Sequence, residues 1–270
     1  MALADILLHL DASPASCNRL DLAINLAKEH RSRLTGLFVI TRQYYQPQSG
    51  EAEAAAEKVR QIFFDRTSGS GIETAWLCSD WSVVGVGMAE IISHHAHYTD
   101  LLIIGQGSVE TLKEGMPADL PERLILAAGR PVMIVPHSGS FGSAGKSVLV
   151  AWKAGRESTR AVNDAMPFLK SAKRVDVLAI NSSENYGDDS QSLCAGICEH
   201  LSRHGVTASP GKMMIMGSSV GDALLNRACE EGHDLLVMGA YAHTPQGKMT
   251  LGTVARQLLK QMTVPVIMSH

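Results

Sequence analysis

The feature that most constrains this chain is an internal duplication. The segments "DLLIIGQGS" at 100–108 and "DLLVMGAYA" at 234–242 align with each other, 134 residues apart. The same shift brings "RPVMIVPH" at 130–137 onto "VPVIMSH" at 264–270, and the opening "DILLHLDASPAS" pairs with "SVLVAWKAGRES". A repeat of this length indicates one structural unit used twice. The sequence therefore predicts two copies of a single domain.

The stretch between the copies looks at first like a phosphate-binding loop. In "SFGSAGKS", Gly145-Lys146-Ser147 stands at the right spacing from Ser140, where such a loop has glycine. A phosphate-binding loop follows a strand and opens a helix, whereas this one precedes the strand-like "SVLVAW". Its glycine and serine content is typical of a flexible connection. We therefore expect domains at 1–137 and 147–270 with a linker at 138–146.

Each copy alternates short β-branched runs with longer amphipathic ones. In the first copy we expect strands at 5–10, 34–40, 72–77, 101–104 and 131–135, and helices at 14–30, 51–67, 86–97 and 119–128. In the second copy we expect strands at 147–152, 174–180, 212–216, 234–238 and 264–268, and helices at 157–170, 189–204, 221–231 and 253–262. Alternation of apolar strands with helices predicts a parallel sheet covered on both faces. The fold class is therefore α/β, with two tandem five-stranded, doubly wound α/β/α sandwiches that pack as a pseudo-dimer.

Composition excludes several classes of partner. The 270 residues carry a formal net charge of -3, which gives no electrostatic reason to expect nucleic acid. Apolar runs all fall short of the roughly 20 residues that cross a bilayer, so we expect no membrane association. Five cysteines, an odd number, favour a reducing compartment over a disulfide framework. Because the first residues lack the basic start of a secretory signal, we expect a cytoplasmic protein.

A possible ligand site follows the fourth strand of the second copy. The strand "DLLVM" ends at Gly239, Ala242 comes three residues later, and Gly252-Thr253 opens the next helix. A glycine at a strand end allows close backbone approach to a ligand. A helix start offers free N–H groups and the positive end of the helix dipole. The pattern suggests a cradle for phosphate, although an ordinary turn and helix cap would look the same.

This unit resembles the G-x-x-G-(nine residues)-G-[S/T] motif of the universal stress protein family, and the likeness covers both copies. The resemblance implies the α/β sandwich described above. It also implies that ATP-binding relatives hold the phosphates on the glycine loop, with the base near an acidic residue that ends the first strand. It further implies homodimers formed through the last strand, here "RPVMIVP" and "TVPVIMSH".

The second copy keeps most of the resembled phosphate motif. Gly239, Gly252 and Thr253 match, and Ala242 replaces the second glycine. Trp152-Lys153 stands where the acidic residue of the first strand would be. The resemblance thus implies phosphate contacts from the loop, while Lys153 either meets phosphate instead of the base or removes adenine recognition.

The first copy departs from the motif in the opposite way. It keeps the acid as Asp11, a backbone contact candidate at Val39, and the first glycine at Gly105. The remaining motif positions are occupied by Ser108, Ala118 and Asp119. Because an aspartate repels phosphate at close range, we expect no triphosphate in this copy.

The function that we expect is that of a stress-response regulatory protein, a homodimer that binds ATP or a related adenine nucleotide in its second domain. The metal we expect is the Mg that accompanies the nucleotide. No general base is evident near the motif, so ATP hydrolysis should be slow at most. One alternative is a scaffold that acts through protein contacts without nucleotide. Another is a serine hydrolase using Ser219 in "GSSVG", with Asp222 or Asp234 and His243 as partners.

Two groups of residues have spacings that could hold a metal. His94 and His97 share a helical face, and Cys194 with Cys198 forms an i,i+4 pair near His200. Exposed histidines at a helix end and small buried cysteines explain these patterns better. The sequence therefore assigns no metal ligands in the protein itself.

Overall fold

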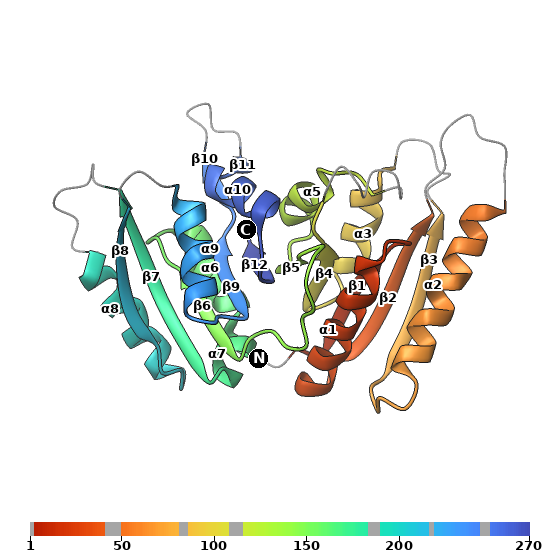
Figure 1. Ribbon diagram of the computed structural model, residues 1–270, viewed down its shortest axis with the longest axis horizontal. Coiled ribbons are helices and arrows are strands. Elements are labelled where there is room, and N and C mark those ends of the chain that lie inside the picture. Colours follow the sequence, from red (N-terminus) through yellow and green to blue (C-terminus); the bar gives the residue numbers. More distant parts are fainter. Residues whose placement is uncertain are drawn as a thin grey trace. The chain divides into compact units, whose positions relative to one another are not determined.

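The chain divides into two compact units in the computed structural model, one ending at Ser143 and one running from Ala144 to His270 (Figure 1). The structure describes residues 3–40, 50–80, 86–107, 116–182, 190–215, 219–243 and 249–270. Within these ranges, no helix is both long and apolar enough to span a membrane.

The N-terminal unit contains a five-stranded parallel sheet in the order β3-β2-β1-β4-β5. Its elements are β1 (Asp5–Leu10), α1 (Ala15–His30), β2 (Arg33–Ile40), α2 (Glu51–Thr67), β3 (Thr74–Asp80), α3 (Met88–Ala96), β4 (Leu101–Gly105), α5 (Leu120–Ala127) and β5 (Val132–Val135).

The C-terminal unit repeats this sheet in the equivalent order β12-β9-β6-β7-β8. Its elements are β6 (Ser147–Ala151), α6 (Arg156–Asp164), α7 (Met166–Ser171), β7 (Arg174–Ser182), α8 (Ser190–Arg203), β8 (Ser209–Ile215), α9 (Val220–Glu230), β9 (Leu235–Gly239), β10 (Tyr241–His243), β11 (Met249–Leu251), α10 (Thr253–Gln261) and β12 (Val266–Ser269). The predicted fold class, two five-stranded parallel α/β domains in tandem, is confirmed.

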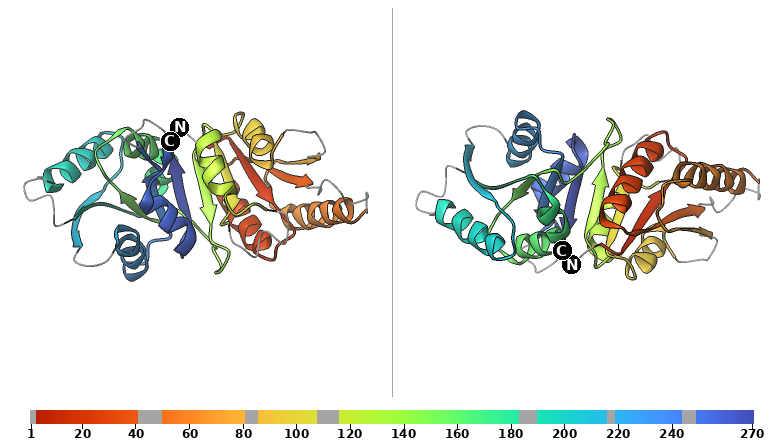
Figure 2. Two further views of the ribbon diagram at one scale, coloured as in Figure 1. Left: turned by 90° about the horizontal axis from the view of Figure 1, so that it is seen from above. Right: turned by 90° about the horizontal axis from the view of Figure 1, so that it is seen from below.

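Helices cover both faces of each sheet (Figure 2). In the N-terminal unit, α1 and α2 contact each other on one face, and α3 and α5 contact each other on the opposite face. In the C-terminal unit, α9 and α10 pack together in the same way. Helix α1 shows why: Leu20, Ala23, Ile24 and Ala27 are buried, and this spacing of three and four residues forms one apolar helical face.

The structure differs from the sequence-based prediction at two places in the C-terminal unit. The single helix expected at 157–170 is divided into α6 and α7, with Pro167 at the start of α7. Proline has no N–H to donate within a helix, and its ring clashes with the preceding turn. The loop expected after β9 also contains a short antiparallel hairpin, β10–β11.

One carboxylate in each unit binds the start of the first strand to the start of the fourth. In the N-terminal unit, Oδ2 of Asp100 accepts the backbone N–H groups of Ala4 at 2.7 Å and Asp5 at 3.0 Å. The N–H of Asp100 in turn donates to the carbonyl of Asp5 at 2.9 Å. We call this arrangement the strand clamp.

The strand clamp of the C-terminal unit uses the stretch that resembles a phosphate-binding loop. Oδ1 of Asp234 accepts from the N–H groups of Gly145 at 3.0 Å and Ser147 at 2.9 Å, and Oδ2 accepts from Lys146 at 3.1 Å. The backbone donors of "GKS" therefore bind a carboxylate of the same unit. Because the donors are already used, this stretch is part of the frame of the domain.

We predict that Asp234→Ala destabilises the C-terminal unit by about 2–4 kcal/mol, since it leaves three backbone donors without their charged acceptor. The measurement is the free energy of unfolding by urea. The control is Glu199→Ala, which removes an exposed ion pair with Arg203 and should cost no more than about 0.5 kcal/mol. Equal losses for the two variants would show that the strand clamp is not a stabilising element.

Candidate functional site

In each unit, the first and fourth strands lie side by side, and the chain leaves them toward opposite edges of the sheet. These pairs are β1 with β4 and β6 with β9. In open parallel sheets, ligands bind beyond the carboxyl ends of such a pair. Most of the residues proposed from the sequence lie at these two places, and the two units arrange them differently.

In the N-terminal unit, a buried ion pair lies at this position. Nη2 of Arg19 lies 2.6 Å from Oδ2 of Asp11, and the two residues are 2% and 7% exposed. Nε of Arg19 donates to the carbonyl of His9 at 3.0 Å, and Oδ1 of Asp11 accepts the N–H of Ser13 at 2.9 Å. Burial acts to raise the pKa of Asp11, but Arg19 and the other partners lower it to about 2. Both carboxylate oxygens are therefore engaged within the unit.

Gly105 provides the space for this arginine. A Cβ atom placed on Gly105 would lie 2.2 Å from Nη1 of Arg19. The guanidinium thus lies between the ends of β1 and β4, at the edge where open parallel sheets bind ligands. The sequence analysis missed Arg19, although an arginine within the apolar face of α1 is a signal for a buried charge pair. Val39, also proposed from the sequence, is a buried residue of β2, 5% exposed.

The start of α5 is poorly suited to an anion. Asp119 is its N-cap residue, Pro121 lies in its first turn and lacks an N–H, and Glu122 adds a second acidic group. The positive end of the helix therefore faces negative side chains. Ala118 is exposed just before the helix, and Ser108 lies outside the described residues.

In the C-terminal unit, the loop after the first strand makes the same backbone contact, but it carries a positive residue instead of a negative one. The N–H of Lys153 donates to Oγ of Ser158 at 3.3 Å, as the N–H of Asp11 donates to Oγ of Ser16 at 3.2 Å. Lys153 thus takes the position of Asp11, and the sequence alignment places Ala161 opposite Arg19. The Lys153 side chain is exposed and has no acidic partner among the described residues. A cation with no internal partner replaces the neutralised pair.

Helix α6 explains why Gly239 is a glycine. A Cβ atom there would lie 2.6 Å from the carbonyl carbon of Glu157 and 2.8 Å from the nitrogen of Ser158. The start of α6 therefore packs directly on the end of β9. Beside it, the indole Nε1 of Trp152 is buried and has no hydrogen-bond partner in the part of the chain that the structure describes. A buried donor of this kind needs an acceptor, and the described residues do not supply one.

The start of α10 is open to an anion. Gly252 is its N-cap residue, and the Gly252 N–H donates to the carbonyl of Ala240 at 3.0 Å, which fixes the helix start to the end of β9. No side chain among the described residues caps the helix, its first turn has no acidic residue, and Thr253 is exposed. Ala242 lies in β10, and its side chain is outside the described residues.

Ser219 is the N-cap residue of α9. Its hydroxyl donates to the Asp222 carboxylate at 2.7 Å and accepts from the Asp222 N–H at 3.1 Å and from Gln257 at 2.5 Å. All of its hydrogen-bonding capacity is used in the cap. The hydrolase alternative requires a histidine at this hydroxyl, and the described contacts include none; the side chain of His243 lies outside the described residues.

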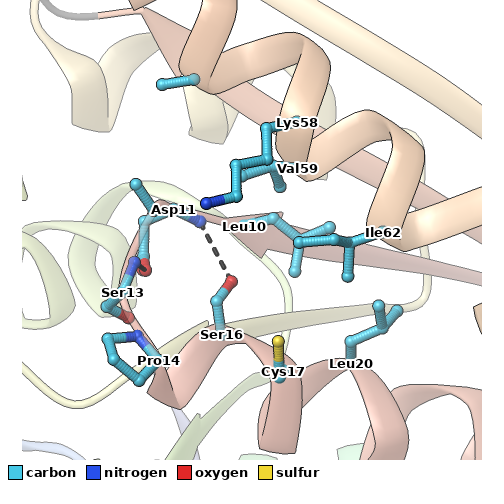
Figure 3. A pocket seen from close by; sticks show the side chains of 12 residues that line it. Leu10, Asp11, Ser13, Pro14, Ser16, Cys17, Leu20, Lys58, Val59 and Ile62 are labelled. Carbon is cyan, nitrogen blue, oxygen red and sulfur yellow. Dashed lines mark hydrogen bonds between the residues drawn. The ribbon is translucent and has the colours of Figure 1, made fainter.

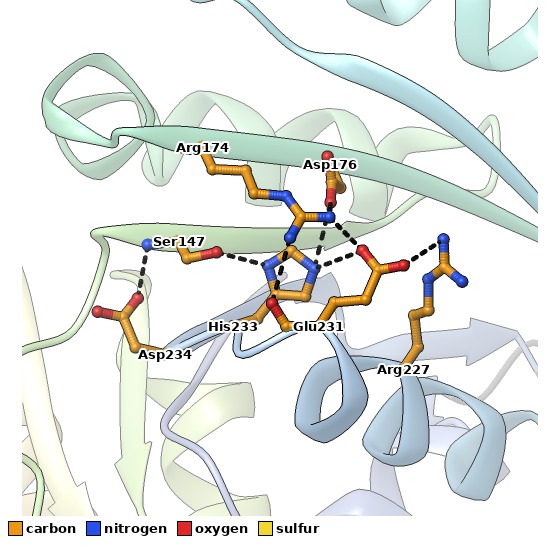
Figure 4. Close-up of polar contacts among 7 residues, drawn as sticks. All are labelled: Ser147, Arg174, Asp176, Arg227, Glu231, His233 and Asp234. Carbon is orange, nitrogen blue, oxygen red and sulfur yellow. Dashed lines mark hydrogen bonds and ion pairs between the residues drawn. The ribbon is translucent and has the colours of Figure 1, made fainter.

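A group of ionisable residues, which the sequence analysis did not find, lies at the amino ends of β6, β7 and β9 (Figure 4). Asp176, Glu231 and His233 bring possible metal ligand atoms within 4.8 Å of one another. Arg174, however, bonds to the same oxygens, Oδ2 of Asp176 at 2.5 Å and Oε2 of Glu231. Burial lowers the pKa of His233, although the Asp176 carboxylate acts in the opposite sense. We assign this group to stability because the arginine takes the place of a cation.

The histidines and cysteines whose spacing suggests a metal site make hydrogen bonds within the protein. Nε2 of His97 lies 3.3 Å from the carbonyl of Ala127. The thiol of Cys194 donates to the carbonyl of Gly211 at 3.6 Å. Burial raises the pKa of Cys198 to about 11, which disfavours the thiolate that binds metal.

We predict that Arg19→Met destabilises the N-terminal unit by about 3–5 kcal/mol, because it leaves the Asp11 carboxylate buried without its cation. The measurement is chemical unfolding at neutral pH. Arg66→Met is the matched control, since it removes an exposed ion pair with Asp21 and should cost about 1 kcal/mol or less. Adding Asp11→Ala to Arg19→Met should recover part of the loss; a double variant as unstable as the sum of both changes would contradict this account.

We predict that His9 makes the fold sensitive to mild acid. Burial lowers the pKa of this residue, which is 1% exposed, from 6.5 to about 4. Below pH 6.5 the unfolded chain gains a proton that the folded chain does not, so stability falls with pH and the loss is complete below about pH 4. The loss between about pH 7 and pH 5 should be about 2 kcal/mol smaller in His9→Met than in the unchanged protein. His94→Met, at an exposed position, is the control, and equal pH profiles for all three proteins would refute the prediction.

Comparison with known proteins agrees with this architecture. Residues 208–270 match the model of the universal stress protein family. A universal stress protein from Archaeoglobus fulgidus matches in structure with a TM-score of 0.72 and 17% identity, over 98% of this chain and 95% of that one. A protein of unknown function from Pseudomonas aeruginosa matches with a TM-score of 0.62 and 14% identity, over 99% of this chain and 92% of that one. No curated protein matches the chain in sequence. The chain thus has the universal stress protein fold twice in tandem, and its residues 208–270 match the model of the universal stress protein family.

Proposed function

We propose that the C-terminal unit binds a phosphate-bearing ligand, ATP or a related adenine nucleotide, and that the protein acts in this way as a regulator of a stress response. The observation that carries the proposal is the start of α10. It is fixed to the end of β9, has no side-chain cap from the part of the chain that the structure describes, and has no acidic residue in its first turn. Free N–H groups and the helix dipole at such a position favour phosphate.

Charge supports the same unit over the other. The C-terminal unit carries the exposed Lys153 at the end of β6, whereas the N-terminal unit has a neutralised pair at the end of β1. At the start of α5, Asp119 and Pro121 occupy the positions that Gly252 and Val254 occupy at the start of α10. Each of these differences makes the C-terminal unit more favourable to an anion.

Trp152 is a second candidate for a ligand contact in this proposal. Ala151 pairs with Met238, so Trp152 and Gly239 follow at the same edge of the sheet. The buried indole N–H of Trp152 lacks an acceptor among the described residues. In our proposal an acceptor on the base or sugar of the nucleotide satisfies this donor. Trp152 and Lys153 thus replace the acidic residue that the family resemblance implies at the base.

The groups of the proposed phosphate site are suited to binding a ligand and not to catalysis. Its functional groups are backbone donors, the Thr253 hydroxyl and the Lys153 ammonium. These groups stabilise phosphate, but none of them is a general base that activates water. We therefore expect binding with slow ATP hydrolysis at most, and a signal passed on through protein contacts.

We predict that ATP binds the unchanged protein in isothermal titration calorimetry and that Gly252→Asp weakens the affinity by at least about tenfold, or roughly 1.4 kcal/mol. The introduced carboxylate repeats the situation at Asp119, and aspartate is a favourable N-cap residue, so the helix should still form. Lys153→Glu should weaken ATP by a similar factor.

The control is Lys173→Glu, which makes the same change of charge at an exposed position before β7, at the opposite edge of the sheet. It should bind ATP like the unchanged protein. Equal affinity in Gly252→Asp would place any nucleotide elsewhere. An absence of binding heat and of thermal stabilisation with ATP would instead favour the scaffold alternative, which the neutralised pair of the N-terminal unit supports.

A further inference from the structure

The N-terminal unit has a pocket beside Asp11 (Figure 3). The pocket lies between the start of α1 and the inner face of α2 and has a volume of about 310 Å³. This volume is at the lower end of the range for small-molecule sites. The side chains of Leu10, Leu20, Val59 and Ile62 form its apolar part.

The polar groups of this pocket give it a positive character. Asp11 lines the pocket, but its carboxylate is engaged with Arg19 and the Ser13 N–H. The ammonium group of Lys58 extends from α2 across the pocket toward the start of α1 (Figure 3). Helix α1 directs its positive end here and has no acidic residue in its first turn.

Two further observations support a ligand. The Ser13 hydroxyl is buried and lines the pocket; it makes no close hydrogen bond among the described residues, although its interaction with the Asp11 carboxylate helps to lower the pKa of that group. The sulfur of Cys17 points from α1 into the pocket, on the side opposite Lys58 (Figure 3). The pocket thus combines an apolar floor, the Lys58 cation and a buried hydroxyl without a close hydrogen-bond partner.

We propose that this pocket binds a small molecule with an apolar body and a single carboxylate. The apolar body contacts the floor formed by α1, α2 and β1, and the carboxylate pairs with Lys58. A nucleotide fits this arrangement less well, because the Asp11 carboxylate already accepts hydrogen bonds from Arg19 and from the Ser13 N–H. The site is independent of the phosphate cradle proposed in the C-terminal unit.

The test uses the cysteine that lies in the pocket. The full-length protein is alkylated with iodoacetamide, and the rate at each cysteine is measured by mass spectrometry with and without octanoate. We expect saturating octanoate to slow alkylation of Cys17 at least fivefold. Cys78 and Cys229 are exposed and serve as controls in the same sample, with unchanged rates. Octanol, which lacks the charge, should protect Cys17 at least fivefold less well at equal concentration.

Variants then test the two parts of the pocket. Lys58→Gln should weaken octanoate at least fivefold in calorimetry and leave octanol unchanged, whereas Lys28→Gln, at an exposed position of α1, should change neither. Ala55→Phe places a ring in the pocket and should abolish binding, with its melting temperature measured without ligand to show that it folds.

Three outcomes would overturn the proposal. The first is that octanoate leaves Cys17 unprotected, or protects Cys78 and Cys229 equally. The second is that octanol protects as well as octanoate, or that Lys58→Gln binds octanoate normally, because the carboxylate is then not recognised. The third is that ATP or adenosine protects Cys17 more strongly than octanoate, which would make this a nucleotide pocket.

Discussion

The buried pair of Arg19 and Asp11 determines how the N-terminal unit is organised. A buried charge is tolerated only with a partner, so this pair holds α1 against the ends of β1 and β4. The guanidinium then lies between the ends of β1 and β4, at the edge where open parallel sheets bind ligands. In the C-terminal unit the two positions are Lys153 and Ala161, and the start of α6 packs directly on Gly239. The two units therefore differ at two positions. Asp11 and Arg19 form a buried pair in the N-terminal unit, whereas the C-terminal unit presents the cation of Lys153.

The backbone contacts that position the first and fourth strands are the same in both units. Asp100 and Asp234 bind the starts of the first strands through backbone N–H groups, and Ser16 and Ser158 bind the loops after those strands. These contacts set the positions of the strand ends without using the groups that face the cleft. The side chains at the cleft can therefore differ in charge while the backbone remains alike. In our account the Asp11 carboxylate of the N-terminal unit is neutralised by Arg19 of the same unit, and the C-terminal unit is the copy that binds phosphate.

Periodicity and duplication predict most of this fold, because alternating apolar runs and a repeated order of elements depend on local sequence. The division of one expected helix at Pro167 was predictable in principle, but an amphipathic pattern that continues past the proline concealed it. The role of Arg19 and the pocket at Lys58 depend on which side chains meet in three dimensions, which spacing alone does not give. Pairing of the two copies through their last strands stays a prediction, as do the nucleotide contacts of Gly252 and Thr253.

The measurement that tests the central claim most directly is an NMR titration of the ¹⁵N-labelled protein with ATP, followed at the backbone amides of the two equivalent helix starts. The account predicts that the amides of Thr253 and Val254 shift on binding, since their N–H groups face the phosphate, while those of Leu120 and Glu122 do not. Shifts at Leu120 and Glu122 without shifts at Thr253 and Val254 would contradict the assignment of phosphate binding to the C-terminal unit.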